Sequence, residues 1–179
     1  MWALVEDSKI SKVYNKPTQL TIGDIKYPSN IHTLWSESQL KAIGVYIVIE
    51  DNSNLKNKEY YINTNQTFNF ASNKVTASYG AATAKDLDTL KTEKSKEIDE
   101  IAYSLLQPND WMVVRNAESS KAIPSDWLDY RVNVRSTATD MKTKINAVAD
   151  VDALAALYVY NDADPPVRPL GEFPTPPTS

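Results

Sequence analysis

The sequence predicts an α+β protein: an N-terminal β-rich module, a long connecting helix, and a C-terminal helical module with a Pro-rich extended tail. Two patterns of residues, one in each half of the chain, support this class. Residues 1–83 contain short runs of β-branched and aromatic residues separated by polar turn signals, which is typical of strands. From Ala84 onward, apolar residues recur every three or four positions, which is the period of a helix.

The β-rich module, residues 1–83, is expected to begin with two hairpins. A polar turn separates the apolar runs 2–5 and 10–14, and Gly23-Asp24 separates two shorter runs. One short helix should begin after Ser36 and end at Gly44, where a left-handed residue is favoured. Further strands are expected over residues 45–50, 59–63, 67–71 and 74–79, with a turn at Ser72-Asn73.

Residues 84–107 are expected to form one long connecting helix. Its apolar row contains Leu87, Leu90, Ile98, Ile101 and Leu105, and Lys94 interrupts this row. Two alternatives stay open, because such a row can pack on the chain's own sheet or on a partner helix, where it would form the seam of a homo-oligomer. The polar run TEKSKE is expected to be a solvated face or a projecting stalk.

The helical module, residues 108–160, should contain a turn between helices. Pro108 ends the connecting helix, and Asn109-Asp110 can cap the segment that begins at Trp111. A second helix should start after Ser125, which is a good N-cap residue.

That second helix is expected to continue to Ala149, and residues 150–158 should add a short helix. The tail, residues 161–179, is expected to be an extended arm because six of its last 15 residues are prolines. Such an arm either stays in solvent or lies across a neighbouring subunit.

Composition argues against several classes of protein. The formal net charge of −4 argues against nucleic-acid binding, which needs a basic surface. Cysteine is absent, so the chain has no disulfide, which fits a reducing compartment or a virus assembled in one. No apolar run in the sequence, including residues 45–49, approaches the roughly 20 residues needed for membrane insertion. Glu6 and Asp7 also leave no signal-peptide pattern at the start.

The residues that catalysis requires are scarce. His32 is the only histidine, and no nucleophile-elbow sequence accompanies it. The four glycines are isolated, so no phosphate-cradling loop is expected. Asn161, Asp162 and Asp164 lack the glycine and the distal glutamate of a calcium loop, and a turn is expected there instead. We therefore expect no catalytic residues, no cofactor and no metal site.

Large aromatic and guanidinium side chains make the region around residues 105–135 the candidate interaction site. Tryptophan, tyrosine and arginine are favoured at interface centres, although they also serve in a small helical core or in ion pairs with Asp126 and Asp129. Together with the helix row, the candidate partner-binding residues are Leu87, Leu90, Ile98, Ile101, Trp111, Arg115, Trp127 and Arg131.

This region resembles the C-terminal part of phage tail-fibre assembly proteins and related small tail proteins. That family has a leucine pair followed by Thr/Ser/Asn-Asp-Trp, and then a Trp-x-x-Tyr-Arg-x-x-aliphatic-Arg helix. The matching residues here are Leu105, Leu106, Asn109, Asp110 and Trp111, and then Trp127, Tyr130, Arg131, Val134 and Arg135.

Three other segments look like small tail proteins of marine tailed phages: MWALVEDSKISKVYN, TIGDIKYPSNIHTLWSESQLKAIGVY and RPLGEFP. After Asp-Trp the chain departs from the family, continuing with residues 112–115, MVVR, where many members have Thr-Gln-Leu-Pro-Asp.

The resemblance implies a non-enzymatic virion protein of the phage tail. Its partners would be other tail or fibre subunits, or further copies of the same chain in a homo-oligomer. It would reside in the host cytoplasm during assembly. The alternative is a fibre-assembly chaperone that binds the fibre and then either leaves it or stays as a cap. A hydrolase acting on cell-surface polymer is a third class, which would require two carboxylates facing each other across a groove.

Overall fold

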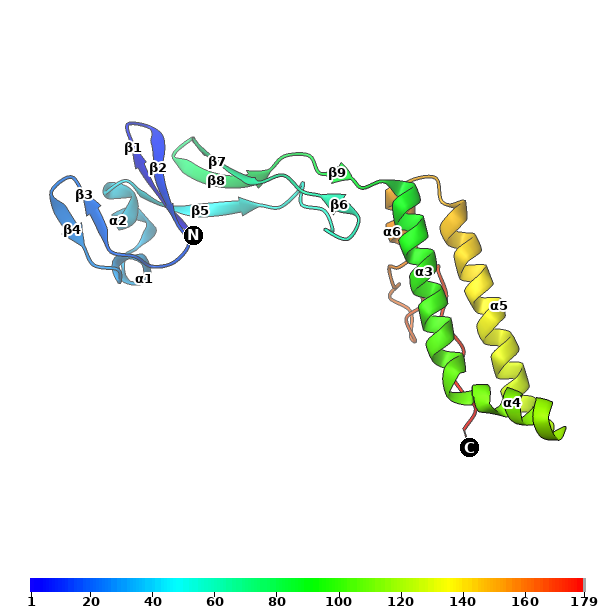
Figure 1. The fold of residues 1–179 in the computed structure, drawn as a ribbon. Helices are drawn as coiled ribbons and strands as arrows, with labels where there is room; N and C mark the ends of the chain where they lie inside the picture. The colour runs from blue at the N-terminus through cyan, green and yellow to red at the C-terminus, as the bar shows by residue number, and fades with distance from the viewer. Residues whose placement is uncertain (179) are drawn as a thin grey trace. The chain divides into compact units, whose positions relative to one another are not determined.

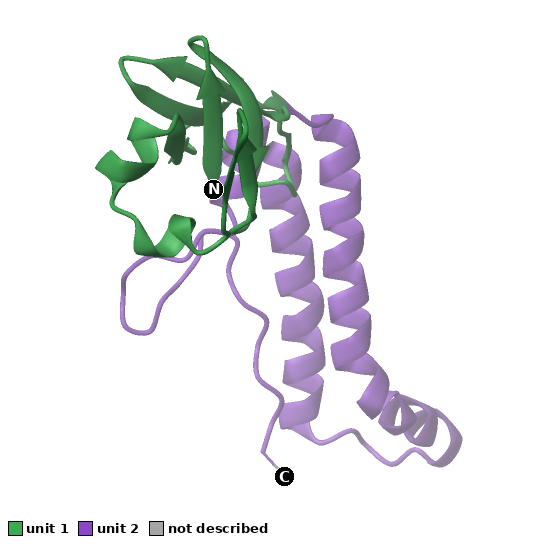
Figure 2. Ribbon diagram, turned by 90° about the vertical axis from the view of Figure 1, so that its left-hand side faces the viewer, with its two compact units in different colours: residues 1–83 green, residues 84–179 purple. Residues whose placement is uncertain are grey.

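The computed structural model describes residues 1–178 and confirms the α+β class. The chain divides into two compact units, Met1–Thr83 and Ala84–Ser179 (Figures 1 and 2). Strands dominate the first unit and helices the second. The change from a strand pattern to a helix pattern near Ala84 therefore coincides with the boundary between the units.

The first unit is built on a five-stranded sheet (Figure 1). Its strand order is β2-β1-β5-β8-β7. All neighbours are antiparallel except β5 and β8, which are parallel. The bounds of these strands are Trp2–Glu6 for β1, Lys9–Tyr14 for β2, Val45–Asp51 for β5, Gln66–Ala71 for β7 and Lys74–Tyr79 for β8.

Smaller elements complete this unit. Two of them are two-stranded sheets, β3 with β4 and β6 with β9. The helix expected after Ser36 is present as α2, and a one-turn helix that was not expected, α1, precedes it. The bounds are Leu20–Ile22 for β3, Ile25–Tyr27 for β4, Ile31–Leu34 for α1, Glu37–Ala42 for α2, Tyr61–Ile62 for β6 and Thr83–Ala84 for β9.

Local turn chemistry fixes the β7–β8 hairpin and the end of α2. Both residues of the β7–β8 turn, Ser72 and Asn73, have positive φ angles of 50° and 59°. A turn of this hand matches the right-handed twist of the strands it joins. Gly44 ends α2 with a φ of +79°, and a Cβ added there would lie 2.7 Å from the backbone oxygen of Val5. Glycine is therefore required at this position on both counts.

The two faces of the sheet carry separate cores. Ala3 belongs to a cluster with Tyr46, Val48, Val75 and Ala77. The next residue, Leu4, points to the opposite face because side chains alternate along a strand. Its cluster contains Leu20, Ile31, Leu40 and Val45, which come from β3, α1, α2 and β5.

The second unit is a helical hairpin. Helix α3 runs beside α5 in both views, and α4 lies at the end where the chain turns (Figures 1 and 2). The bounds are Leu87–Leu106 for α3, Gln107–Asn109 for a 3-10 turn, Asp110–Ser119 for α4, Ser125–Ala147 for α5 and Val151–Ala156 for α6.

Two members of the expected apolar row, Leu90 and Ile98, pack inside this hairpin, whereas Leu87 and Leu105 are half-buried and Ile101 is exposed. The buried row on α3 is Leu90, Lys94, Ile98 and Ala102, at intervals of four residues. On α5 the buried side chains are Tyr130, Arg131, Val134, Ala138, Met141 and Ile145. Leu90 and Ile98 are each only 3% exposed within one chain, and a homo-oligomer seam along this row stays a prediction.

The run TEKSKE, residues 92–97, is not solvated throughout as expected, because Lys94 is buried. Its side chain occupies the buried row and the residue is only 6% exposed. The ammonium group pairs with Glu97 at 2.8 Å and lies 5.2 Å from the centre of the Tyr158 ring. The stem therefore fills the row while the charged end reaches a carboxylate and an aromatic face.

The Pro-rich tail lies against helices of its own chain around Leu170. Leu170 is buried, and its backbone N–H donates to the carbonyl of Leu157 at 3.0 Å. The Lys144 ammonium group on α5 donates to the carbonyls of Pro169 at 2.8 Å and Leu170 at 3.1 Å. The tail lacks regular structure, as the prolines predict, but these bonds fix its path.

The hairpin core predicts unequal effects for two neighbouring isoleucines. Replacing the buried Ile98 with alanine should lower the free energy of unfolding of the helical unit by about 3 kcal/mol, because it leaves a cavity. Ile101 is 44% exposed, so the matched change should cost less than about 1 kcal/mol. Chemical denaturation followed by circular dichroism at 222 nm measures both values. Equal losses would contradict the packing described here.

Candidate functional site

Local signals at the end of α3 turn the chain into α4. Helix α3 ends at Leu106, and Pro108 then sits within the first two positions of the 3-10 turn, where its missing N–H costs no hydrogen bond. At the other end of α4, Ser120 adopts the left-handed conformation with φ of 55°. Its N–H donates to the carbonyl of Asn116 at 2.9 Å. Helix α4 thus has defined ends at both sides.

One guanidinium group ties this turn to α5. Arg131 is only 4% exposed, and one of its terminal nitrogens donates to the carbonyl of Leu106 at 3.2 Å and to the side-chain oxygen of Asn109. The other terminal nitrogen pairs with the Asp110 carboxylate at 2.7 Å. We call these contacts the Arg131 clamp. The planar fork of arginine can serve several acceptors at once, which lysine cannot do in the same geometry.

The Arg131 clamp corrects two expectations. No side-chain cap bond is formed at the Asn109 N-cap position of α4, and both Asn109 and Asp110 bind Arg131 instead. The arginine also pairs with Asp110 and not with Asp126 or Asp129. The residue types that favour a helix start therefore serve a tertiary contact here.

Helix α4 has no buried residue within the described chain, residues 1–178. Trp111 is 53% exposed and Val114 is 54% exposed. The Arg115 guanidinium carbon lies 4.7 Å from the centre of the Trp111 ring, which is cation–π geometry. An ordered helix that leaves large apolar side chains in solvent is typical of an interaction surface.

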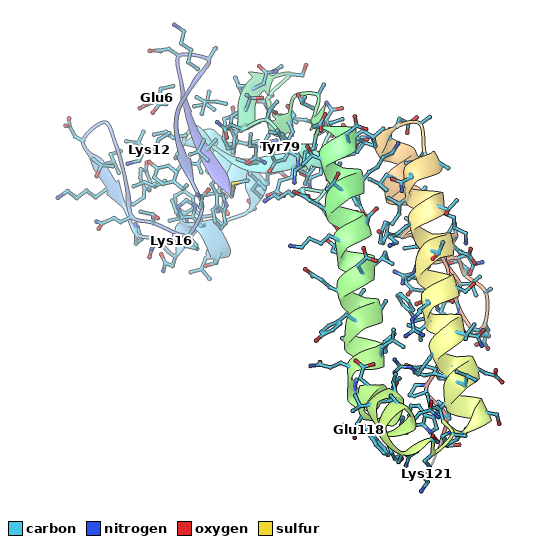
Figure 3. The ribbon with its side chains drawn as sticks, turned by 45° about the vertical axis from the view of Figure 1, so that its right-hand side comes forward. Glu6, Lys12, Lys16, Tyr79, Glu118 and Lys121 are labelled. Carbon is cyan, nitrogen blue, oxygen red and sulfur yellow. The ribbon has the colours of Figure 1, made fainter. Side chains whose placement is uncertain are left out.

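Four side chains of α4 form one face. Trp111, Val114, Arg115 and Glu118 stand at positions i, i+3, i+4 and i+7, which lie along one side of a helix. We call these four residues the display face. Figure 3 shows the labelled Glu118 at the end of the helical hairpin, near Lys121.

Arg115 has unused hydrogen-bonding capacity in this face. Its Nε atom is shielded from solvent and has no hydrogen-bond partner among residues 1–178. The ring of Trp111 holds the guanidinium in place without satisfying its donors. Because Nε itself is shielded by the chain, an acceptor on a bound molecule would have to meet the terminal nitrogens of the guanidinium.

The remaining residues predicted for partner binding lie elsewhere. Trp127 is half-buried at the start of α5, where its ring meets the ring of Tyr130 edge-on at a centroid distance of 5.8 Å. Leu87 is half-buried at the start of α3, and Ile101 is exposed on the same helix. The structure thus brings together Trp111, Arg115 and Arg131 at the end of the hairpin, with Arg131 inside and the other two outside.

Sequence reasoning missed Val114 and Glu118. The signal was present, because both residues continue the helical spacing that starts at Trp111.

A hollow of about 580 Å³ lies where the tail meets α6. Arg168 pairs there with Glu172 at 2.7 Å and lies 5.4 Å from the centre of the Tyr160 ring. The hydrogen bond from the Tyr160 hydroxyl to Glu172 raises the pKa of Tyr160, because it stabilises the neutral phenol. The hollow is lined by Ala156, Val159, Tyr160, Asn161, Val167, Arg168 and Pro169.

His32 lies in the core of the first unit. Its ring centre is 4.7 Å from that of Trp2, and its Nε2 atom is 3.0 Å from the carbonyl oxygen of Thr18. These contacts give the imidazole a structural position. Within residues 1–178, no group of three or more His, Asp or Glu side chains gathers as a metal site. No helix in the described part of the chain is long and apolar enough to cross a bilayer.

The Arg131 clamp predicts a measurable stability loss. Replacing Arg131 with alanine should lower the free energy of unfolding of the helical unit by about 2–3 kcal/mol, because the side-chain oxygen of buried Asn109 loses its donor. The lysine variant should lie between alanine and wild type. Arg135→Ala is the matched control, since exposed Arg135 makes a single bond to the Arg131 carbonyl at 3.3 Å. Thermal denaturation measures all three, and equal effects at positions 131 and 135 would argue against the clamp.

Comparisons of this chain with protein-family models, with curated proteins and with solved structures found no match.

Proposed function

We propose that this chain is a non-enzymatic structural component of a phage tail, associated with the fibre or the baseplate. It acts through protein contacts made by the display face of α4. This role would place it in the virion, and in the host cytoplasm during assembly. Other tail or fibre subunits would be its partners.

One observation carries the proposal. The two separate parts of the motif that resembles small tail proteins contact each other through the Arg131 clamp. Leu106, Asn109 and Asp110 come from the first part, and Arg131 comes from the second. Tyr130 and Val134 of the second part are buried in the same hairpin. A motif whose members hold one substructure together has a physical reason to recur as a unit.

Trp111, one of the exposed residues of that motif, supports a role in protein contacts. Trp111 belongs to the first part of the motif, yet it is 53% exposed and carries the Arg115 guanidinium on its ring. Tryptophan and arginine are the residue types most enriched among interface residues that contribute strongly to binding. The clamp thus holds the helix, and the helix presents the tryptophan.

Mass spectrometry of purified phage particles tests the proposal. We expect peptides from both the Trp2 region and the Pro-rich tail, in a constant ratio to the major tail proteins across independent purifications. A non-structural phage protein that is abundant in the lysate serves as the control for carry-over. Presence in infected-cell lysate but not in particles would refute the structural role and favour an assembly chaperone.

A further inference from the structure

We infer that α4 is a ligand helix, whose display face inserts into an apolar groove on another protein that presents a carboxylate to Arg115. This inference deepens the proposed function and rests on it for the context in which the partner is sought. It concerns the chemistry of the partner, which the proposed function leaves open.

The spacing of the display face favours a groove. Helices that bind in apolar grooves place their anchor residues at positions i, i+3, i+4 and i+7. Trp111, Val114, Arg115 and Glu118 occupy these positions on α4. Trp111 and Val114 supply the apolar area, and each is more than half exposed.

The size of α4 argues against a flat contact with a second copy of this chain. Ten helical residues extend for about 15 Å. One face of such a helix covers much less than the roughly 800 Å² that each partner buries in a stable interface. A groove also contacts the flanks of the helix, so it buries more surface of the same ten residues.

The charge on the display face specifies the groove further. Arg115 forms no ion pair within residues 1–178, and its Nε atom is shielded and unpartnered. Inserting this guanidinium into an apolar groove without an acceptor would be unfavourable, because a desolvated charge needs a partner. A carboxylate satisfies the guanidinium with charge-assisted hydrogen bonds. Glu118 lies at the end of the row, where it can remain at the solvated rim.

The free helix is already arranged for this insertion. The Arg131 clamp fixes its first turn, and Asn116 donates to the carbonyl of Lys121 at 3.0 Å beyond its last turn. The Trp111 ring holds Arg115 at 4.7 Å. Little conformational freedom remains to be lost on binding, which favours affinity.

Site-specific photo-crosslinking in infected cells tests the inference. Benzoylphenylalanine replaces Val114 in one variant of the full chain and Val132 in the other, because both valines are 54% exposed but lie on different helices. We expect the Val114 variant to give at least tenfold more cross-link to one other protein than the Val132 variant. The cross-linked peptide, identified by mass spectrometry, should come from an apolar groove that contains an Asp or Glu residue.

A charge exchange then tests the carboxylate. Arg115→Glu in the Val114 cross-linking variant should reduce the yield at least tenfold, and replacing the mapped carboxylate of the partner with lysine should restore it. Restoration also shows that the Arg115→Glu chain is folded. Equal cross-linking at positions 114 and 132, cross-links only within the chain or to a second copy, no cross-link, or no effect of Arg115→Glu would each overturn the inference.

The two proposals fail separately. If the chain is missing from particles but the Val114 cross-link and its charge exchange persist in lysate, the structural role fails and the ligand helix stands. If the chain is present in particles but cross-links equally from both positions, the ligand helix fails and the structural role stands.

Discussion

The Arg131 guanidinium is the constraint on which the end of the helical unit depends. Helix α4 has ten residues and, within the described chain, none of them is buried. An isolated helix of this length is marginal in water, because nucleation is unfavourable and tertiary packing normally supplies its stability. The clamp replaces that packing with charge-assisted bonds to Asp110 and Asn109 at the first turn. The negative Asp110 also lies at the positive end of the helix dipole, so the same contact supports the helix itself.

Sequence patterns predicted the elements whose cause is local. The β7–β8 hairpin follows from Ser72 and Asn73, which tolerate positive φ, and the end of α2 follows from Gly44, which has no room for a Cβ. Both turns are decided within a few residues of chain. The division of the chain near Ala84 was predictable for the same reason, since the hydrophobic period changes there.

Contacts between distant residues could not be predicted in the same way. Lys94 breaks the apolar period, yet it occupies the buried row because Glu97 and the Tyr158 ring receive its charge. Asn109 and Asp110 are good capping residues, and only the approach of Arg131, more than 20 positions later, explains why they do not cap. Leu170 is one apolar residue in a Pro-rich tail, and its burial depends on Lys144 and the Leu157 carbonyl. In each case the decisive partner is remote in sequence.

The residues that hold α4 in place are different from the residues of the display face. The contacts that position α4 involve its first residue and the turn before it, whereas the display face begins at Trp111 and contributes no buried side chain to the hairpin. Substitutions on that face therefore leave the Leu90 and Ile98 core unchanged. If α4 binds a partner as proposed, such a division would allow its partner preference to change without loss of the fold, because the residues that hold the helix are not the residues of the display face.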